Sequence, residues 1–360
     1  MGSVNIYVPI VLLGLLVFIT LIIFLAEKFL GDHSEKKIYI NDDATISVHG
    51  DDTALNILTN NKIYLPSACG GKATCGTCKF QLIDYDRPPK ATELPFLSKQ
   101  EIADGVRLSC QTKVTTDLRI VLPKGLLTAK EYVGLVESVE DLTYDIKLVR
   151  FKLNEPMPFK PGQYVQIKVP GIDTVRAYSI ASSMEDPSHI ELIIRFVPKG
   201  EATTFVHKAM IVGDKITITG PFGDFFLHED SDKPMIMIAG GSGKAPIRSI
   251  VYRLMSLGFK RKASYFFGAR TTKDLYYTDY FLDVSKRFPN FEYIPALSHS
   301  TEEENWTGEK GLITDVVGRF SDDLSNHEAY LCGSPGMIDA CIKVLKSKGM
   351  PEENIYFDKF

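Results

Sequence analysis

The sequence predicts a multidomain chain: a transmembrane helix, a small α+β domain, an antiparallel β-barrel and a doubly wound α/β domain. Three observations predict this. One apolar run without charge fills Ile6–Ala26, and four of the six cysteines fall between residues 69 and 110. Strand-like segments with turn signals dominate residues 131–227, whereas strands and helices alternate from residue 232. We expect domains at 1–30, 31–127, 128–230 and 231–360.

The composition limits the classes of function. At about 150 residues per domain, 360 residues allow two to three domains. Hydrophobic residues make up 44% and charged residues 24%, which excludes a largely disordered chain and one with many membrane spans. The 41 basic and 45 acidic residues give a net charge of −4, so nucleic acid is not an expected partner. Six cysteines are too few for a disulfide scaffold.

The apolar run IYVPIVLLGLLVFITLIIFLA is long enough to span a bilayer as one helix. Its 21 residues, at about 1.5 Å each, cover the hydrocarbon core. A cleaved signal peptide is the alternative, but MGSVN has no basic residue and LAEKFL is a poor cleavage site. Lys28, Lys36 and Lys37 come after the run, so the later residues should face the cytoplasm. We therefore expect a single-pass protein of the inner (cytoplasmic) membrane, with reduced thiols.

The cysteine-rich segment predicts an iron–sulfur cluster. It reads PSACGGKATCGTCKF, in which Cys69, Cys75 and Cys78 have the spacing C-x5-C-x2-C, and Cys110 comes 32 residues later. Thiolates in a tight loop with a distant fourth suit a [2Fe–2S] cluster, and the loop glycines let backbone N–H groups turn toward sulfur. Zinc is an alternative, although zinc sites usually pair two C-x2-C knuckles, and structural thiols are another.

The segments around these cysteines predict a small α+β domain. KIYI and TISVHG are typical of a hairpin, DDTALNILTNN of a helix and IYLP of a strand, and SKQE is a capping box. Residues 36–123 resemble a plant-type ferredoxin (β-grasp) fold, whose strict spacing is C-x4-C-x2-C. The extra residue is found in ferredoxin modules fused to membrane NADH:quinone reductases and in vertebrate-type ferredoxins.

The barrel segment contains a candidate pyrophosphate site. An Arg in an R-x-Y-S motif stands at the start of an expected strand, and a Gly-rich segment opens an expected helix whose N–H groups are free. The Tyr and Ser of the motif could line a flat ring. An exposed Arg and a core Tyr would give the same four letters, so the motif gains weight only from the later motifs of the chain. The candidate residues are Arg176, Ala177, Tyr178, Ser179, Gly200, Ala202, Thr203 and Thr204.

The α/β segment contains two loops at the expected carboxyl ends of strands, where ligands bind in such sheets. A turn without Cβ atoms ahead of a helix lets a dinucleotide phosphate approach. Lys244, within the first turn, is expected to be solvated rather than to bind phosphate. The candidate residues are Gly240, Gly241, Ser242, Gly243, Ala245 and Pro246 in the first loop, Arg270 after the second strand, and Cys332 and Gly333 in the second loop.

In order, R-x-Y-S, G-x-x-T, GPFG, GG-x-G-x-AP, CG-x-P and a terminal aromatic residue resemble the ferredoxin–NADP+ reductase superfamily over residues 130–360. The whole chain resembles the family of F subunits of Na+-translocating NADH:quinone reductase. That resemblance rests on LPSACGG, GPFGDFF, ENWTG-x-x-G-x-I and EENI-x-x-D-x-F. It implies FAD, NADH and a [2Fe–2S] cluster as cofactors, with the four cysteines as metal ligands.

The resemblance also implies roles for the candidate residues. Arg176 and Gly200–Thr204 would bind the FAD phosphates, Tyr178 would flank the isoalloxazine and Ser179 would hydrogen-bond near N5. Gly240–Pro246 would form the dinucleotide turn. Cys332 and Gly333 would lie where the nicotinamide meets the flavin, and Phe360 would cover the flavin until the nicotinamide displaces it.

The implied function is an electron splitter: a hydride passes from NADH to FAD, and single electrons then pass to the cluster and to a membrane redox subunit or a quinone-reducing partner. NADPH stays open on spacing alone, because only Arg270 and TTK come after the second strand. The loop PGIDTVRAYS is much shorter than in typical F subunits, so a reductase component serving an oxygenase is an alternative. A third hypothesis is a non-enzymatic electron carrier, against which the retained reductase motifs count.

Overall fold

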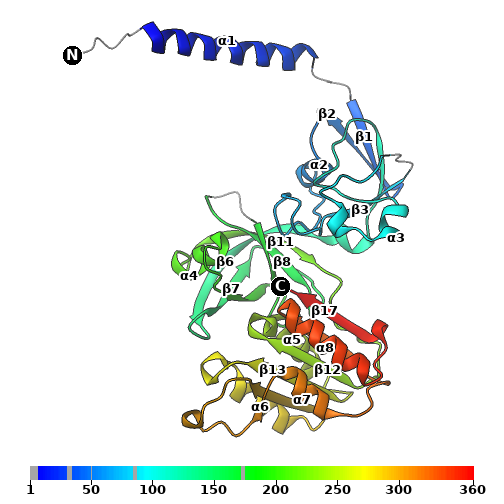
Figure 1. Cartoon of the computed structure of the whole chain (residues 1–360), viewed down its shortest axis with the longest axis vertical. Coiled ribbons are helices and arrows are strands. Elements are labelled where there is room, and N and C mark those ends of the chain that lie inside the picture. The colour runs from blue at the N-terminus through cyan, green and yellow to red at the C-terminus, as the bar shows by residue number, and fades with distance from the viewer. Residues whose placement is uncertain (1–6, 31–34, 50, 84–86, 172–174) are drawn as a thin grey trace, which may run out of the picture. The chain divides into compact units, whose positions relative to one another are not determined.

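The computed structural model describes residues 7–30, 35–49, 51–83, 87–171 and 175–360. The chain forms two compact units, which Figure 1 colours by residue number. The smaller unit comprises Met1–Asn61 and Cys78–Pro123, and the larger comprises Lys62–Thr77 and Lys124–Phe360. The loop that contains Cys69 and Cys75 therefore belongs to the larger unit, together with the two segments expected to form the barrel and the α/β domain.

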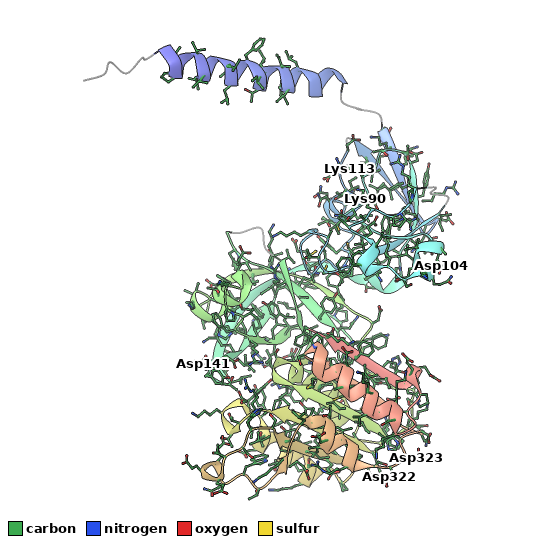
Figure 2. All side chains as sticks on the ribbon, viewed as in Figure 1. Lys90, Asp104, Lys113, Asp141, Asp322 and Asp323 are labelled. Atoms are coloured by element: carbon green, nitrogen blue, oxygen red, sulfur yellow. The ribbon has the colours of Figure 1, made fainter. Side chains whose placement is uncertain are left out.

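The apolar run forms helix α1, Tyr7–Leu30. From Ile10 to Leu25 its large apolar side chains are between 41% and 68% exposed, and they project around the helix in Figure 2. The expected transmembrane span over Ile6–Ala26 is not confirmed, because no helix among the described residues is both long and apolar enough to cross a membrane. Ile6 lies outside those residues.

The smaller unit contains a five-stranded mixed sheet in the order β2-β1-β5-β3-β4. Alternate residues of its strands are buried, so one face of the sheet forms a core. The expected hairpin, helix and capping box are confirmed, with Ser98 and Glu101 forming the box. The expected strand IYLP is wrong, because residues 63–66 have no regular structure. The elements are β1 Glu35–Ile40, β2 Ala44–His49, α2 Ala54–Asn60, β3 Lys79–Ile83, α3 Lys99–Ala103, β4 Val106–Leu108 and β5 Leu118–Val121.

The first half of the larger unit is an antiparallel barrel in the strand order β10-β7-β6-β11-β8-β9. A bridge between Ile180, just after β9, and Leu192 of β10 joins the two ends of this order. Inward residues such as Val165 and Ile167 form its core. The elements are β6 Lys130–Asp141, β7 Ile146–Leu153, β8 Tyr164–Lys168, β9 Val175–Ser179, β10 His189–Arg195, α4 Glu201–Lys208 and β11 Lys215–Phe222.

The second half is a parallel six-stranded sheet in the order β15-β14-β13-β12-β16-β17, with buried, apolar central strands. The strand order reverses at β12, so the carboxyl ends of β12 and β16 flank the position where such sheets bind ligands. The elements are β12 Met235–Gly240, α5 Lys244–Ser256, β13 Ala263–Ala269, α6 Thr278–Arg287, β14 Phe291–Leu297, β15 Glu309–Lys310, α7 Ile313–Phe320, β16 Glu328–Gly333, α8 Pro335–Ser347 and β17 Ile355–Lys359.

Candidate functional site

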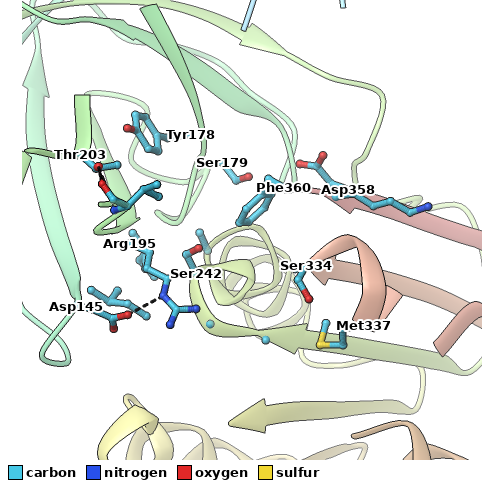
Figure 3. A pocket seen from close by; sticks show the side chains of 18 of the residues that line it. Asp145, Tyr178, Ser179, Arg195, Thr203, Ser242, Ser334, Met337, Asp358 and Phe360 are labelled. Carbon is cyan, nitrogen blue, oxygen red and sulfur yellow. Dashed lines mark hydrogen bonds and ion pairs between the residues drawn. The ribbon is translucent and has the colours of Figure 1, made fainter. Parts of the chain in front are cut away.

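The larger unit contains a cavity of about 1030 Å³ lined by the barrel, the α/β half and the cysteine loop. Figure 3 shows side chains of the barrel and of the α/β half around it. Most of the candidate residues line it, but Thr204, Gly243, Pro246 and Cys332 do not. Those that do are Arg176, Ala177, Tyr178, Ser179, Gly200, Ala202, Thr203, Gly240, Gly241, Ser242, Ala245, Arg270, Gly333 and Phe360.

The barrel supplies a polar half of the cavity. The first turn of α4 lies at its wall and has no side-chain cap, because Gly200 is the N-cap residue. The Thr203 hydroxyl lies within hydrogen-bond distance of the N–H and carbonyl of Val197, which fixes the approach to the helix. The first turn of a helix is a position at which backbone N–H groups bind anions in proteins. Burial raises the pKa of Tyr178 to about 12, so this residue is a neutral phenol at physiological pH.

Arg195 is a further cation in the cavity, in addition to Arg176, Arg270 and Lys359, and no motif of the sequence singled it out. It ends β10, and its Nε donates to Asp145 Oδ2 at 2.7 Å, an ion pair drawn in Figure 3. Burial alone would lower the pKa of Arg195, but Asp145 outweighs it and the pKa is raised. One Arg195 nitrogen lies 3.4 Å from where a Cβ of Gly241 would stand. An Arg at the end of a strand, shortly before the Gly200 turn, is the signal that could have identified it.

The α/β half supplies a turn of closely approaching backbone. Gly241 has φ +55°, a conformation that residues with a side chain rarely adopt. A Cβ on Gly243 would overlap the carbonyl of Cys332, so this glycine lets the end of β12 lie against the end of β16. Gly243 is therefore required by packing, whereas Gly240, Gly241 and Ser242 face the cavity.

Lys244 is not solvated, contrary to the expectation from the sequence. Its side chain is completely buried, and its Nζ donates to the carbonyl of Tyr276 at 2.6 Å and to the hydroxyl of Tyr293 at 3.1 Å. The same nitrogen lies 3.6 Å from the ring centroid of Phe267. Burial, and then the charge of Arg248, lowers the pKa of Lys244 well below its usual value. The lysine thus stabilises the glycine-rich turn through buried hydrogen bonds to Tyr276 and Tyr293.

The C-terminal residues form one end of the cavity. Phe360 is 54% exposed, and its backbone N–H donates to the carbonyl of Gly333 at 3.2 Å. Asp358, two residues earlier, also lines the cavity, and burial raises the pKa of its carboxyl group. Asp358 was not expected from the sequence, although it belongs to the EENI-x-x-D-x-F motif. Cys332 is fully buried next to this end, and burial raises the pKa of its thiol.

The four cysteines are divided between the two units. In the larger unit, Cys69 and Cys75 lie with their sulfur atoms 3.3 Å apart, and Cys75 lines the cavity. Burial opposes ionisation of Cys69, but hydrogen bonds from Thr74 and Cys75 lower its pKa to about 7. In the smaller unit, the Cys110 thiol and burial together raise the pKa of Cys78.

Glycines accompany the cysteine loop, as the sequence predicts. Gly70, Gly71 and Gly76 all have positive φ. Such residues turn successive N–H groups toward one side of a loop, as cluster sulfurs require. Across the described part of the chain, no three His, Cys, Asp or Glu side chains are grouped to hold a metal ion. The pairs Cys69–Cys75 and Cys78–Cys110 are each formed within one unit.

Three family models match the chain in the expected order. They are a 2Fe-2S iron-sulfur cluster binding domain at residues 38–115, an oxidoreductase FAD-binding domain at 134–227 and an oxidoreductase NAD-binding domain at 237–343. The cofactors expected from the sequence are therefore confirmed as a [2Fe–2S] cluster, FAD and a nicotinamide dinucleotide. The cavity fits the last two, because it combines several cationic side chains, the first turn of helix α4 and a glycine-rich turn.

Among solved structures, the chain is similar to two reductases. A cytochrome P450 reductase, GcoB, from Amycolatopsis has a TM-score of 0.76 and 29% identity, over 90% of this chain and 98% of that one. A ferredoxin reductase in carbazole 1,9a-dioxygenase has a TM-score of 0.70 and 28% identity, over 91% and 98%.

Curated relatives fall in two groups. The F subunit of the Na(+)-translocating NADH-quinone reductase of Neisseria meningitidis is 33% identical, over 97% of this chain and 99% of the relative. The phenol hydroxylase P5 protein of Acinetobacter pittii is 37% identical, over 88% and 91%. With the three domain matches, these identities show that the chain is an NADH-dependent flavin and iron–sulfur oxidoreductase, and that it belongs to the family of the F subunits of Na(+)-translocating NADH-quinone reductase and their reductase-component relatives.

Proposed function

We propose that this chain is the electron-input module of a membrane-associated complex, delivering electrons from NADH to a membrane redox subunit or a quinone-reducing partner. The observation that carries the proposal is the cavity of the larger unit, which is lined by the Gly240–Ser242 turn, by the R-x-Y-S strand and by Cys75. When bound, FAD would supply the conversion of a two-electron hydride from NADH into single electrons for the [2Fe–2S] cluster. A path from a dinucleotide site to a cluster ligand is what such a relay needs.

The residues of the barrel half would bind and orient the flavin. Arg176 and the backbone N–H groups in the first turn of α4 would neutralise its pyrophosphate. Tyr178 would lie along the ring, and the Ser179 hydroxyl would hydrogen-bond to its reacting edge. Phe360 would cover the opposite side and exclude water until a nicotinamide enters.

The residues of the α/β half would hold the nicotinamide dinucleotide. Gly240–Ser242 would let the pyrophosphate approach the backbone, with Arg195 as its countercharge. Arg270 would lie at the adenosine end. Gly333, beside the terminal ring, would leave room for the nicotinamide, and the buried Cys332 would support it from below.

Cys69, Cys75, Cys78 and Cys110 would be the cluster ligands. Thiolates bind iron in such clusters, and the lowered pKa of Cys69, about 7, favours its ionised form before metal arrives. Cys75 is the ligand that lines the cavity, so it would be the point at which electrons enter the cluster.

Helix α1 would attach the protein to a bilayer. The support for this is its row of exposed apolar side chains between Ile10 and Leu25, which lipid would cover at a gain of about 25 cal/mol per Å². We expect the full-length protein to float with phospholipid vesicles in a density gradient and the protein lacking residues 1–30 to stay in the soluble fraction. Full-length protein that also stays soluble would contradict the attachment.

The acceptor is tested by activity with membranes. We expect full-length protein to support NADH-dependent quinone reduction only with membranes that contain its partner subunits. A second candidate function is favoured by the 37% identity to the phenol hydroxylase P5 protein: a reductase component that serves an oxygenase. Protein without residues 1–30 that transfers electrons to an oxygenase as fast as the full-length chain would favour this second candidate.

A further inference from the structure

Strand β8 presents polar side chains outside the barrel. Val165 and Ile167 point into the barrel core, so Tyr164 and Gln166 lie on the opposite face of the strand. Gln166 is nevertheless only 6% exposed. A buried amide on the outer face of a barrel needs hydrogen-bond partners from whatever covers it.

The cover is the cysteine loop. With its amide oxygen turned toward this loop, Gln166 accepts hydrogen bonds from the backbone N–H of Ser67 at 2.7 Å and of Ala68 at 3.2 Å. These two residues immediately precede Cys69. One side chain therefore satisfies two adjacent N–H groups at the entrance of the cysteine loop.

The contact continues to the sulfur atoms. The N–H of Ala68 also lies 3.3 Å from the Thr77 hydroxyl, which in turn lies 3.1 Å from the sulfur of Cys75. The Ser67 hydroxyl accepts from the N–H of Gly71 at 2.8 Å, which closes the loop on itself. A continuous set of hydrogen bonds thus joins β8 to Cys75.

On its other side, Gln166 is anchored to the R-x-Y-S strand. Its cross-strand partner in β9 is Ala177, which stands between Arg176 and Tyr178. Gln166 therefore contacts both parts of the site. Its backbone pairs with the strand that contains the proposed flavin-binding side chains, and its amide oxygen accepts hydrogen bonds from the cysteine loop.

We propose that Gln166 is a positioning residue that fixes the Cys69–Cys75 loop relative to strand β9 and thereby sets the rate at which electrons pass from the flavin to the cluster. This inference rests on the proposed roles of β9 and of the cysteines. It assigns to Gln166 no part in hydride transfer, because its side chain does not line the cavity.

The test uses the full-length protein with its cofactors and three variants. Gln166→Leu removes the acceptor, Gln166→Glu keeps an oxygen for the two N–H groups, and Gln163→Leu is the matched control. Gln163 lies just before the same strand, but its amide contacts Lys160 and Gly223 rather than the cysteine loop. Stopped-flow absorbance records flavin bleaching by NADH, and freeze-quench electron paramagnetic resonance records cluster reduction.

We expect Gln166→Leu to bleach its flavin at the wild-type rate and to reduce its cluster about tenfold more slowly, since small displacements of reacting groups have large effects on rate. Gln166→Glu should restore most of the rate, and Gln163→Leu should behave as wild type. Hydrogen exchange gives a readout without turnover: amides of residues 67–72 should exchange faster in Gln166→Leu alone.

Several results would overturn the inference. Cluster reduction at the wild-type rate in Gln166→Leu would do so, as would an equal slowing of both steps or failure of Gln166→Glu to recover. A Gln166→Leu protein without a cluster signal after dithionite would also overturn it, because Gln166 would then be needed to retain the cluster. A different result would contradict the proposed function itself: a wild-type cluster that dithionite reduces but NADH does not. The role of Gln166 in electron transfer would then be contradicted as well.

Discussion

Lys244 shows how much a single residue depends on its surroundings. A lysine in a glycine-rich turn is usually solvated or bound to phosphate, yet this one is enclosed by aromatic rings and donates to Tyr276 and Tyr293. Tyr276 in turn donates from its hydroxyl to the carbonyl of Gly241 at 2.7 Å. The lysine thereby braces the turn whose other face lines the cavity.

Replacing Lys244 by Met should change how stability depends on pH. The pKa of Lys244 is lowered in the folded protein, so between that pKa and the unfolded value near 10.4 the unfolded state binds more protons. The wild-type free energy of unfolding then rises with pH by up to about 1.4 kcal/mol per unit from this group, a contribution that Met lacks. Urea unfolding at pH 7, 8 and 9 measures the free energy of unfolding of both proteins. The value for wild type minus that for Lys244→Met should increase as the pH rises. A difference independent of pH would mean that Lys244 stays charged when folded.

Phe360 gives a prediction about ligand binding. Its ring lies in the cavity, and its backbone N–H donates a hydrogen bond to the carbonyl of Gly333. If the ring occupies the nicotinamide position in most molecules, Phe360→Ala should tighten NAD+ binding by about tenfold, because ligand no longer has to displace it. Calorimetric titration of the oxidised protein measures this. Unchanged or weaker binding would show that the ring lies outside the nicotinamide position.

The sequence predicted the environment of individual side chains less well than it predicted helices, strands and domains. Most of the residues that the R-x-Y-S and glycine motifs indicated do line the cavity, because strand and turn signals are local. Arg195, Asp358 and the burial of Lys244 depend on contacts between segments far apart in the chain. Periodicity and spacing contain no information about those contacts.

At the scale of elements, the turn after β12 packs directly against the end of β16, because Gly243 has no side chain to separate them. Arg248 of α5 also reaches the barrel: its Nη1 donates to Glu191 of β10 at 2.6 Å and to the carbonyl of Ala181 at 3.0 Å. A buried pair of this kind fixes the orientation of the helix that comes after the dinucleotide turn. The contact between the turn and β16 and the contact between Arg248 and the barrel together fix the α/β half of the cavity against the barrel half.

Gly243→Ala should be costly at this scale. Its Cβ would overlap the Cys332 carbonyl, so the backbone must shift, and such overpacking destabilises proteins by about 1–3 kcal/mol. The displaced turn should also raise the KM for NADH. Gly336→Ala in α8 is the matched control, because its Cβ would meet nothing within 4 Å, and alanine favours helix by about 1 kcal/mol. Thermal unfolding and NADH titration of both variants test this, and equal behaviour would contradict the packing argument.

Most elements could be predicted from the sequence, because period-two and helical patterns, caps and glycine turns are read over a few residues. The Ser98 capping box and the strand–turn–helix at residues 235–256 are examples. The IYLP segment failed because its apolar pattern reflects packing of an irregular loop. The C-terminal strand β17 was not expected, since only its place beside β16 makes Ile355–Lys359 a strand.

At the scale of the whole molecule, residues expected to bind different cofactors come from segments that are far apart in the sequence. The expected order of cluster, flavin and dinucleotide segments agrees with the three family matches. No pattern in the sequence indicated that the loop Lys62–Thr77 packs as part of the larger unit. That arrangement brings Cys75 to the same cavity as Ser179 and Gly241, which is the basis of the proposed relay.

The most direct test of the proposed relay is anaerobic mixing of the full-length protein with NADH, with flavin absorbance and cluster paramagnetic resonance recorded on the same sample. We predict that the flavin bleaches first and that a rhombic signal of a reduced [2Fe–2S] cluster then appears. Bleaching without that signal, in protein whose cluster dithionite does reduce, would contradict the relay.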